Sequence, residues 1–275
     1  MRISNLFVFA ATLLSLLSCG AGKGVVVMSY NVRNSKAKDG ENNWDNRRSA
    51  TPAMLKAVKP DVFGVQEAYP NQEQYILETA PDYKCYGVGR DDGVDKGERM
   101  SVFYNTKRFE LKDHGTWWLS ETPDVPSLGW DAKCVRTATW VLLKDKKNGK
   151  EFYFVNTHLD HVGRQAQRNG LLLVVSKIRE MNPDIPMILT GDFNVTPQDS
   201  VLKALNGLML DSRTVAKKTV SDPSFNGFKK TGGSVIDYIY FSGFSSAESF
   251  RVVNEDFAGK PFISDHYPIV SELKY

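Results

Sequence analysis

The sequence predicts a single α/β domain. Short runs of apolar and β-branched residues recur along the 275 residues, and several of them end abruptly in an acid or an amide. Between them, residues 163–181 carry apolar side chains at helical spacing. No repeat, low-complexity tract or Pro/Gly/Ser-rich linker interrupts the chain, and its hydrophobic content of 41% is ordinary for a globular protein. One sizeable core is therefore expected.

The first residues are expected to be a secretory signal, not part of the fold. Arg2 supplies a positive charge, and residues 6–17 form an apolar stretch too short to span a bilayer. The signal would comprise residues 1–18. Cys19, followed by glycine and alanine, resembles a bacterial lipobox cysteine that is acylated after cleavage; a simple cleaved signal is the alternative. We expect an exported bacterial protein, periplasmic or lipid-anchored to the outer membrane, with its domain at residues 24–275.

Charge and cysteine content say little about partners. The net charge of +3 is small and its charges are mixed, so nucleic acid is not indicated as a partner by charge, although it is not excluded. Membrane contact is expected only through the lipid, and a monomer is expected because no coiled-coil pattern is present. Cys85 and Cys134 are either bridged, as an oxidising compartment permits, or free buried thiols.

The segment that organises the chain is residues 187–197. Its apolar run reads as a buried strand that ends in Gly191, where a tight bend is allowed. Asp192 and Asn194 follow directly, at the point where a sheet delivers side chains to a cleft. An Asx-turn, in which these two side chains only cap local backbone, is the alternative.

Two earlier strands end in the same way. Residues 25–31 form an apolar run that ends in Asn31, and residues 61–67 form one that ends in Glu67. A polar residue at such a position is either a turn former or a site residue. Glu67 is alternatively the first-turn acid of a helix over residues 70–80, where it would stabilise the helix dipole.

Two further helices are expected at residues 45–58 and 198–205. On the first of them, a solvated face would carry Arg47, Arg48 and Lys56.

The middle of the chain, residues 83–143, predicts meandering strands with a Pro-rich aromatic loop among them. Trp117, Trp118 and Trp130 either stack on a substrate at the rim of a cleft or pack in the core. Arg136 points either to a carboxylate partner or into the site, where its guanidinium would hold a phosphate through two parallel hydrogen bonds.

The second half supplies histidines. Asn156, His158 and Asp160 follow an apolar strand and share one face by strand alternation. Asp237 is embedded in another apolar strand and needs a partner, because burying an unpaired carboxylate costs several kcal/mol. His266, just before the last strand, is the natural candidate.

These residues together indicate metal-assisted attack on a phosphate ester. Hard carboxylate and amide oxygens without thiolates suit Mg²⁺ or Mn²⁺ better than zinc. Histidines beside such a site suit proton transfer or the stabilisation of negative charge. The candidates are Asn31, Glu67, His158, Asp160, Asp192, Asn194, Asp237, Asp265 and His266.

The chain resembles the endonuclease/exonuclease/phosphatase superfamily, in an exported bacterial branch. The resemblance covers residues 25–275 and depends on six motifs in family order: Ser29-Tyr30-Asn31, Gln66-Glu67, Asn156-Thr157-His158, Gly191-Asp192-Phe193-Asn194, Ile236-Asp237-Tyr238 and Ser264-Asp265-His266. It implies a four-layer sandwich of two mixed β-sheets flanked by helices. It also implies a Mg²⁺-dependent hydrolase acting on a phosphate mono- or diester, with Mn²⁺ as the other metal to consider.

The resemblance also implies roles. Glu67 would be the principal metal ligand, with Asn31 and Asp265 near the same ion. Asp192 would orient the attacking water and Asn194 would hold the water or the phosphate.

Two histidines complete the implied site. His266, oriented by Asp237, and His158 would contact the scissile phosphate. Which group takes the proton, and whether a second metal lies near Asp192, stay open.

One departure separates the chain from abasic-site endonucleases. Arg33 stands where those enzymes carry an acid, which adds positive charge beside the phosphate. Substrate contacts are expected from Arg33, Arg136, Asp160, Trp117 and Trp130. An exported nuclease and a non-catalytic module that binds a phosphorylated ligand are the alternatives to a phosphoesterase.

Overall fold

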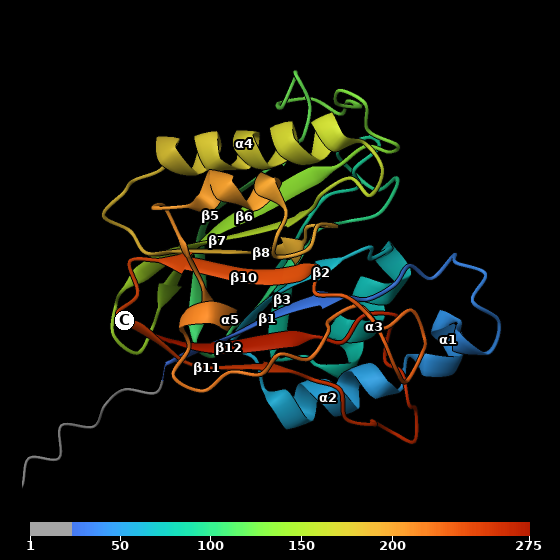
Figure 1. Cartoon of the computed structure of the whole chain (residues 1–275). Helices are drawn as coiled ribbons and strands as arrows, with labels where there is room; N and C mark the ends of the chain where they lie inside the picture. Colours follow the sequence, from blue (N-terminus) through green and yellow to red (C-terminus); the bar gives the residue numbers. More distant parts are fainter. Residues whose placement is uncertain (1–23) are drawn as a thin grey trace, which may run out of the picture.

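Two six-stranded β-sheets face each other across the middle of the molecule (Figure 1). The computed structural model describes residues 24–275, so the expected signal and Cys19 lie outside the described residues. Within residues 24–275, no helix is both long and apolar enough to cross a membrane.

Both sheets are mixed. The first has the order β11-β12-β1-β2-β4-β3 and the second β5-β6-β7-β8-β10-β9. One pair in each sheet is parallel, β1 with β2 and β7 with β8, and the other neighbours are antiparallel. The strands are β1 Val25–Asn31, β2 Val62–Gln66, β3 Tyr83–Tyr86, β4 Val102–Asn105, β5 Phe109–Trp118, β6 Thr137–Asp145, β7 Glu151–His158, β8 Met187–Asp192, β9 Leu210–Asp211, β10 Asp237–Ser242, β11 Ser246–Val252 and β12 Ile269–Lys274.

Helices cover the outer faces of the two sheets. The long helix α4 and the 3₁₀ helix η2 lie over the second sheet, whereas α2 and α3 lie over the first (Figure 1). The predicted four-layer sandwich is confirmed. The helices are η1 Gly40–Asn42, α1 Trp44–Arg47, α2 Ala50–Val58, α3 Pro70–Thr79, α4 Arg164–Glu180, η2 Ser200–Leu205 and α5 Ser212–Val215.

Three apolar clusters hold the layers together. The central one fills the space between the sheets with side chains such as Phe109, Phe152 and Phe241. The other two lie between each sheet and its helices. Because alternate residues of a strand point to opposite faces, every central strand is apolar on both sides until it reaches the edge where polar residues begin.

Buried amides join the two sheets beneath that edge. Gln66 Nε2 of the first sheet donates to Asn156 Oδ1 of the second at 2.7 Å, and Asn156 Nδ2 donates to the Val65 carbonyl at 2.7 Å. A Cβ on Gly64 would overlap the Asn156 side chain, so glycine is required where the sheets approach most closely.

The expected helix at residues 45–58 is wrong in one respect, because it is two helices, α1 and α2. Pro52 lies in the first turn of α2 and has no N–H to donate to the carbonyl of Arg48, so an uninterrupted helix loses that bond. Arg47 also departs from the expected solvated face. It is only 2% exposed and donates to the carbonyls of Asn42, Ile263 and Arg33.

Other local expectations also needed correction. Residues 198–205 were expected to form a helix, and the structure has the 3₁₀ helix η2 there, while β9, β11 and α5 were not predicted. Asp160 does not share the strand face of His158, because β7 ends at His158. Cys85 and Cys134 are free thiols, which settles the alternative of a bridge.

Candidate active site

The polar strand ends meet at one edge of the sandwich. In the second sheet, Asp192 at the end of β8 is the register neighbour of His158 on β7 and of Asp237 on β10. In the first sheet, β1 and β2 run parallel and bring Asn31 and Glu67 to the same edge. Asn31 Nδ2 links the two sheets by donating to Glu67 Oε1 at 3.0 Å and to Asp192 Oδ2 at 3.1 Å.

Glu67 is held as a carboxylate. The backbone and side-chain nitrogens of Asn34 donate to its Oε2 at 3.1 and 3.0 Å. Burial alone would raise the pKa of Glu67, but the hydrogen bond from Asn31 and the charges of His266 and Arg33 outweigh it and lower the pKa. The side chain therefore presents negative charge in a water-poor place.

Arg33 shows that this corner accepts positive charge. Its guanidinium makes two 2.9 Å bonds to Asp39, lies 3.6 Å from Asp265 Oδ2 and lies 3.9 Å from Glu67 Oε2. Two carboxylates, the half-buried Glu67 and the buried Asp265, thus face one cation, and the Asn31 amide lies beside Glu67, with its Oδ1 accepting from the Arg33 backbone N–H at 2.9 Å. This all-oxygen donor set fits a hard divalent ion, which Glu67, Asp265 and Asn31 would hold and which would polarise a phosphate oxygen.

A second group contains Asp192, Asp237 and His266, whose ligand-capable atoms lie within 4.8 Å of one another. His266 Nδ1 is 2.9 Å from Asp237 Oδ2, and His266 Nε2 is 3.6 Å from Asp192 Oδ2. Both ring nitrogens therefore face carboxylates. We interpret this group as a proton network and not as the metal centre, because the ring is committed to its acids.

The protonation states of the network follow from burial and charge. Burial by itself lowers the pKa of His266, but the carboxylates of Asp237 and Asp192 raise it to about 10. Burial raises the pKa of Asp192 to about 7, assisted by Asp237 and opposed by His266. At neutral pH the imidazole of His266 is consequently a cation with its charge directed into the site.

His158 is the opposite case. Burial and the neighbouring cations Arg136 and His266 lower its pKa, so this imidazole is neutral. Its Nε2 lies 3.0 Å from Asn194 Nδ2 and 3.3 Å from Asp192 Oδ2. Asn194 is fixed in turn, since its backbone N–H donates to Asp192 Oδ1 at 2.9 Å. The Asx-turn expected as an alternative is thus present together with the site geometry.

Three residues of this edge have left-handed backbone conformations. The φ angles are 51° at Arg33, 62° at Glu67 and 53° at Asn194. Such conformations cost a non-glycine residue energy and persist where surrounding contacts enforce them, as they do at functional sites. The backbone at these strand ends is therefore held in an unfavourable conformation that positions the side chains of the site.

The edge opens into a cavity of about 690 Å³. It is lined by the metal-ligand candidates Glu67 and Asp265, by His158, Asp192, Asn194 and His266, and by the predicted substrate contacts Arg33 and Arg136. Other lining residues, among them Asn34, Arg90, Glu98 and Phe225, were not predicted from the sequence. Each of these is one polar or aromatic residue among many in a loop.

The predicted tryptophan contacts lie elsewhere. Trp117 stacks on Trp140 at a centroid distance of 5.9 Å and joins the cluster beneath α4, and it is not among the cavity-lining residues. Trp130 has its backbone N–H bonded to Glu121 and is not among the cavity-lining residues. Trp118, by contrast, donates from Nε1 to the carbonyl of Arg90 at 2.7 Å.

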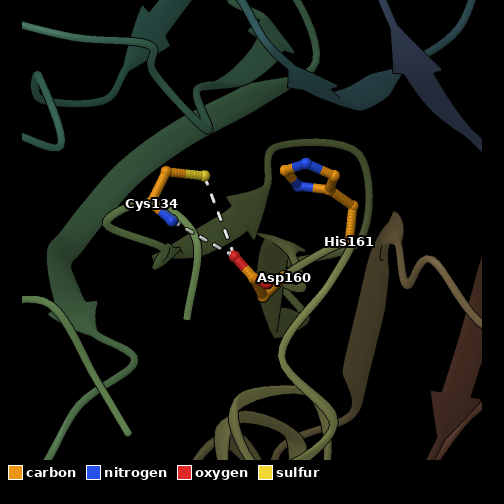
Figure 2. A group of neighbouring side chains, drawn as sticks. All are labelled: Cys134, Asp160 and His161. Atoms are coloured by element: carbon orange, nitrogen blue, oxygen red, sulfur yellow. Dashed lines mark hydrogen bonds between the residues drawn. The ribbon is translucent and has the colours of Figure 1, made fainter. Parts of the chain in front are cut away.

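Asp160 supports the cavity wall from behind. Figure 2 shows its carboxylate facing Cys134, with His161 beside them. Its oxygens accept from the backbone N–H groups of Lys133, Cys134, Val162 and Gly163. This carboxylate is therefore committed to the loops that it joins.

The same cluster does not form a cation site. Arg136 places Nε 3.7 Å from Asp160 Oδ2 and Nη2 3.1 Å from His161 Nδ1. Both Asp160 oxygens already accept from backbone N–H groups, so the cluster offers no carboxylate oxygen that is free for a metal ion. Asp160 orients the cation that faces the cavity.

Fold and site together define a phosphoric ester hydrolase. The chain belongs to the Endonuclease/Exonuclease/phosphatase family, whose model matches residues 28–266. Members of this family hydrolyse phosphate esters and in general depend on divalent metals, and the acidic and histidine groups described above are present for that chemistry.

Solved structures and curated proteins agree with the assignment. A mannosyl-6-phosphatase of Bacteroides thetaiotaomicron is 36% identical, with a TM-score of 0.86, over 92% of this chain and 100% of that one. An endonuclease/exonuclease/phosphatase of Bacteroides vulgatus is also 36% identical, with a TM-score of 0.86, over 92% and 99%. Nocturnin of Rattus norvegicus is 25% identical over 88% of this chain but only 62% of its own length.

Proposed function

We propose that the protein is an exported, Mg²⁺-dependent phosphomonoesterase that releases phosphate from a sugar phosphate. The observation that carries the proposal is the meeting, in one cavity, of an all-oxygen ligand set with a charged histidine and a buried carboxylate of raised pKa. The similarity to a mannosyl-6-phosphatase over nearly the whole chain supports a sugar phosphate as the substrate class. Mn²⁺ would substitute for Mg²⁺, since both ions prefer oxygen ligands.

Each residue of the site would have its own role in the proposed reaction. His266, as a cation held between Asp237 and Asp192, would stabilise the negative charge that grows on the non-bridging phosphate oxygens as water attacks phosphorus, and Asn194 would hold the His158 ring beside them. Asp192 would orient that water and accept its proton while the bond between phosphorus and the sugar oxygen breaks, and the leaving sugar alkoxide would take a proton from solvent. The bound ion would supply Lewis-acid polarisation of the phosphate.

The arginines complete the substrate contacts in this proposal. Arg33 and Arg136 would add positive charge at the cavity wall, and the neutral His158 ring, bonded to Asn194, would keep Asp192 in place beside the phosphate. Trp117 and Asp160 would act through packing and support, because their side chains are engaged elsewhere, and Trp130 does not line the cavity.

Export is part of the proposal and depends on sequence alone. Arg2 and the apolar residues 6–17 have the pattern of a signal, and Cys19 has the context of an acylated cysteine. Mass spectrometry of the protein from a bacterial envelope would show a lipid-modified Cys19 as the first residue. An intact Met1 in that fraction would contradict this part.

The test of the activity compares p-nitrophenyl phosphate, bis-p-nitrophenyl phosphate and an oligonucleotide as substrates for the purified protein with Mg²⁺. We expect the monoester to be hydrolysed with the highest kcat/KM. Preference for the diester or cleavage of the oligonucleotide would favour the exported nuclease. No turnover of any of the three, together with binding of a sugar phosphate, would favour the non-catalytic module.

A further inference from the structure

One side of the cavity carries two residues, Arg90 and Glu98, that have no role in the proposed phosphate chemistry. Arg90 follows β3 and Glu98 precedes β4, at the far end of the first sheet from His266, which precedes β12. In the second sheet, Arg136 precedes β6, whereas Phe225 lies on the loop before β10. The strand order therefore places Arg90, Glu98 and Arg136, which we call the polar wall, opposite His266 and Phe225. Between them lie the strand ends that carry Asn31, Glu67, His158 and Asp192, which we call the catalytic pole.

Glu98 has hydrogen-bonding capacity left over. It is only 9% exposed, yet within the described residues its carboxylate accepts one side-chain hydrogen bond, from Arg90 Nη1 at 2.5 Å. A buried carboxylate offers about four acceptor positions and is normally satisfied. Because Glu98 lines the cavity, its remaining acceptor positions are open to groups that enter there.

The two arginines provide donors next to that acceptor. The guanidinium of Arg90 has five N–H groups, and in the described chain Glu98 is the side chain to which it donates. Arg136 is 5% exposed, contacts His161 at 3.1 Å and has Asp160 at 3.7 Å as its nearest carboxylate. Both guanidinium groups line the cavity with donors to spare.

The polar wall is also rigid. The N–H of Arg90 donates to the carbonyl of Glu98 at 3.1 Å, which closes the loop between them. Trp118 fixes the same loop through its 2.7 Å bond to the Arg90 carbonyl. A preorganised wall loses little entropy when it binds a ligand, so it is suited to selecting a substrate.

The mixture of hydrogen-bond donors and acceptors on the polar wall indicates a ligand that carries hydroxyl groups. A hydroxyl group both donates and accepts, so neighbouring hydroxyls of a sugar can bond to Glu98 and to an arginine at the same time. A second phosphate would satisfy the arginines but would be repelled by the Glu98 carboxylate. The positive charge of Arg90 is already balanced by Glu98, and that of Arg136 is partly balanced by Asp160, so the polar wall has little net charge to offer an anion.

We propose that Arg90 and Glu98 bind hydroxyl groups of the sugar that carries the scissile phosphate, and so select polyhydroxylated leaving groups. The inference rests on the proposed phosphomonoesterase activity and deepens it. Phosphate at the catalytic pole and sugar at the polar wall both fit a cavity of about 690 Å³, within the range of about 300–1,000 Å³ usual for small-ligand sites.

The experiment compares mannose 6-phosphate with hexyl phosphate, an alkyl monoester that lacks the hydroxyls. The quantity measured is the ratio of the two kcat/KM values, in the wild type and in Glu98→Gln. The ratio should fall about 10- to 100-fold in the variant, the effect of losing charge-assisted hydrogen bonds to hydroxyls. Arg90→Lys, which keeps the charge but loses the planar fork, should also lower the ratio.

Glu73→Gln is the matched control. Glu73 is likewise a buried carboxylate paired with an arginine, at 2.7 Å from Arg99, but it does not line the cavity. Its substitution should leave the ratio unchanged whatever it does to the melting temperature. This control separates a general effect of breaking a buried ion pair from an effect on sugar recognition.

The outcomes separate the inference from the function on which it rests. If Glu98→Gln slows both monoesters equally, or neither, the inference is overturned and the phosphomonoesterase stands. If the wild type hydrolyses neither monoester with Mg²⁺ or Mn²⁺, the proposed function fails and the inference falls with it. A lower ratio in Glu98→Gln and in Arg90→Lys, with an unchanged ratio in Glu73→Gln, supports both.

Discussion

Replacing Asp237 with asparagine should move the pH range in which the enzyme works. Asp237 Oδ2 lies 2.9 Å from His266 Nδ1 and is the largest of the charges that raise the pKa of this histidine. Asparagine keeps the size of the side chain and removes the charge. Burial, which lowers the pKa of His266, is then opposed only by weaker partners such as Asp192 at 3.6 Å.

The magnitude follows from the pKa of His266. Its rise from 6.5 to about 10 corresponds to roughly 5 kcal/mol in favour of the imidazolium, and Asp237 is the first contributor. A histidine that acts as a cation is active below its pKa, so lowering that pKa moves the alkaline limb of the rate profile to lower pH. We expect the alkaline limb to move down by at least about one pH unit, and each unit by which the pKa falls below 8 should lower kcat/KM at pH 8 about tenfold.

The assay is kcat/KM for p-nitrophenyl phosphate from pH 5 to pH 10 at saturating Mg²⁺. The matched control is Asp199→Asn, which removes the same charge from a residue that caps η2 and bonds to Arg164. The control should keep the alkaline limb of the wild type. An unshifted limb in Asp237→Asn would refute the assignment of a charged His266 held by Asp237.

Three other perturbations follow from the packing and from the ligand set. Gly64→Ala should lower the free energy of unfolding by about 1–3 kcal/mol, because its Cβ overlaps the Asn156 amide between the sheets; an unchanged midpoint in urea would contradict this. Trp117→Ala should cost about 3 kcal/mol by removing the stack on Trp140. A raised KM with normal stability would instead restore Trp117 as a substrate contact. Mg²⁺ at 100 times its Kd should stabilise the wild type by about 2.7 kcal/mol and Glu67→Gln by much less, measured by thermal shift with EDTA as the reference; equal shifts would refute the ligand set.

The catalytic pole was predictable because its signals are local. Asp192, Asn31 and Glu67 each follow a run of apolar residues, and a polar group at such a strand end is visible in the sequence alone. Asp237 was predictable for a different reason, since an acid within an apolar strand needs a partner, and His266 is that partner at 2.9 Å. Their order along the chain carried the family resemblance, and the family model confirms it.

The polar wall was not predictable because its signal is dispersed. Arg90 and Glu98 lie in a loop with several other charged residues, and only the folded loop shows which pair faces the cavity. Trp117 illustrates the same limit in a strand. Neighbouring residues of a strand point to opposite faces of the sheet, so a shift of one residue in the register of β5 would exchange Trp117 and Trp118. The observed register with β6 directs Trp117 toward α4, whereas Trp118 supports the Arg90 loop.

The most direct test of the central assignment measures metal binding and turnover on the same preparations. Calorimetric titration with Mn²⁺ and hydrolysis of p-nitrophenyl phosphate would be compared in the wild type and in Glu67→Gln. We predict that EDTA stops the wild type, that Mg²⁺ or Mn²⁺ restores it, and that Glu67→Gln binds the metal at least about tenfold more weakly and loses activity. Turnover that resists EDTA, or a Glu67→Gln variant that binds metal and hydrolyses the ester like the wild type, would contradict the site described here.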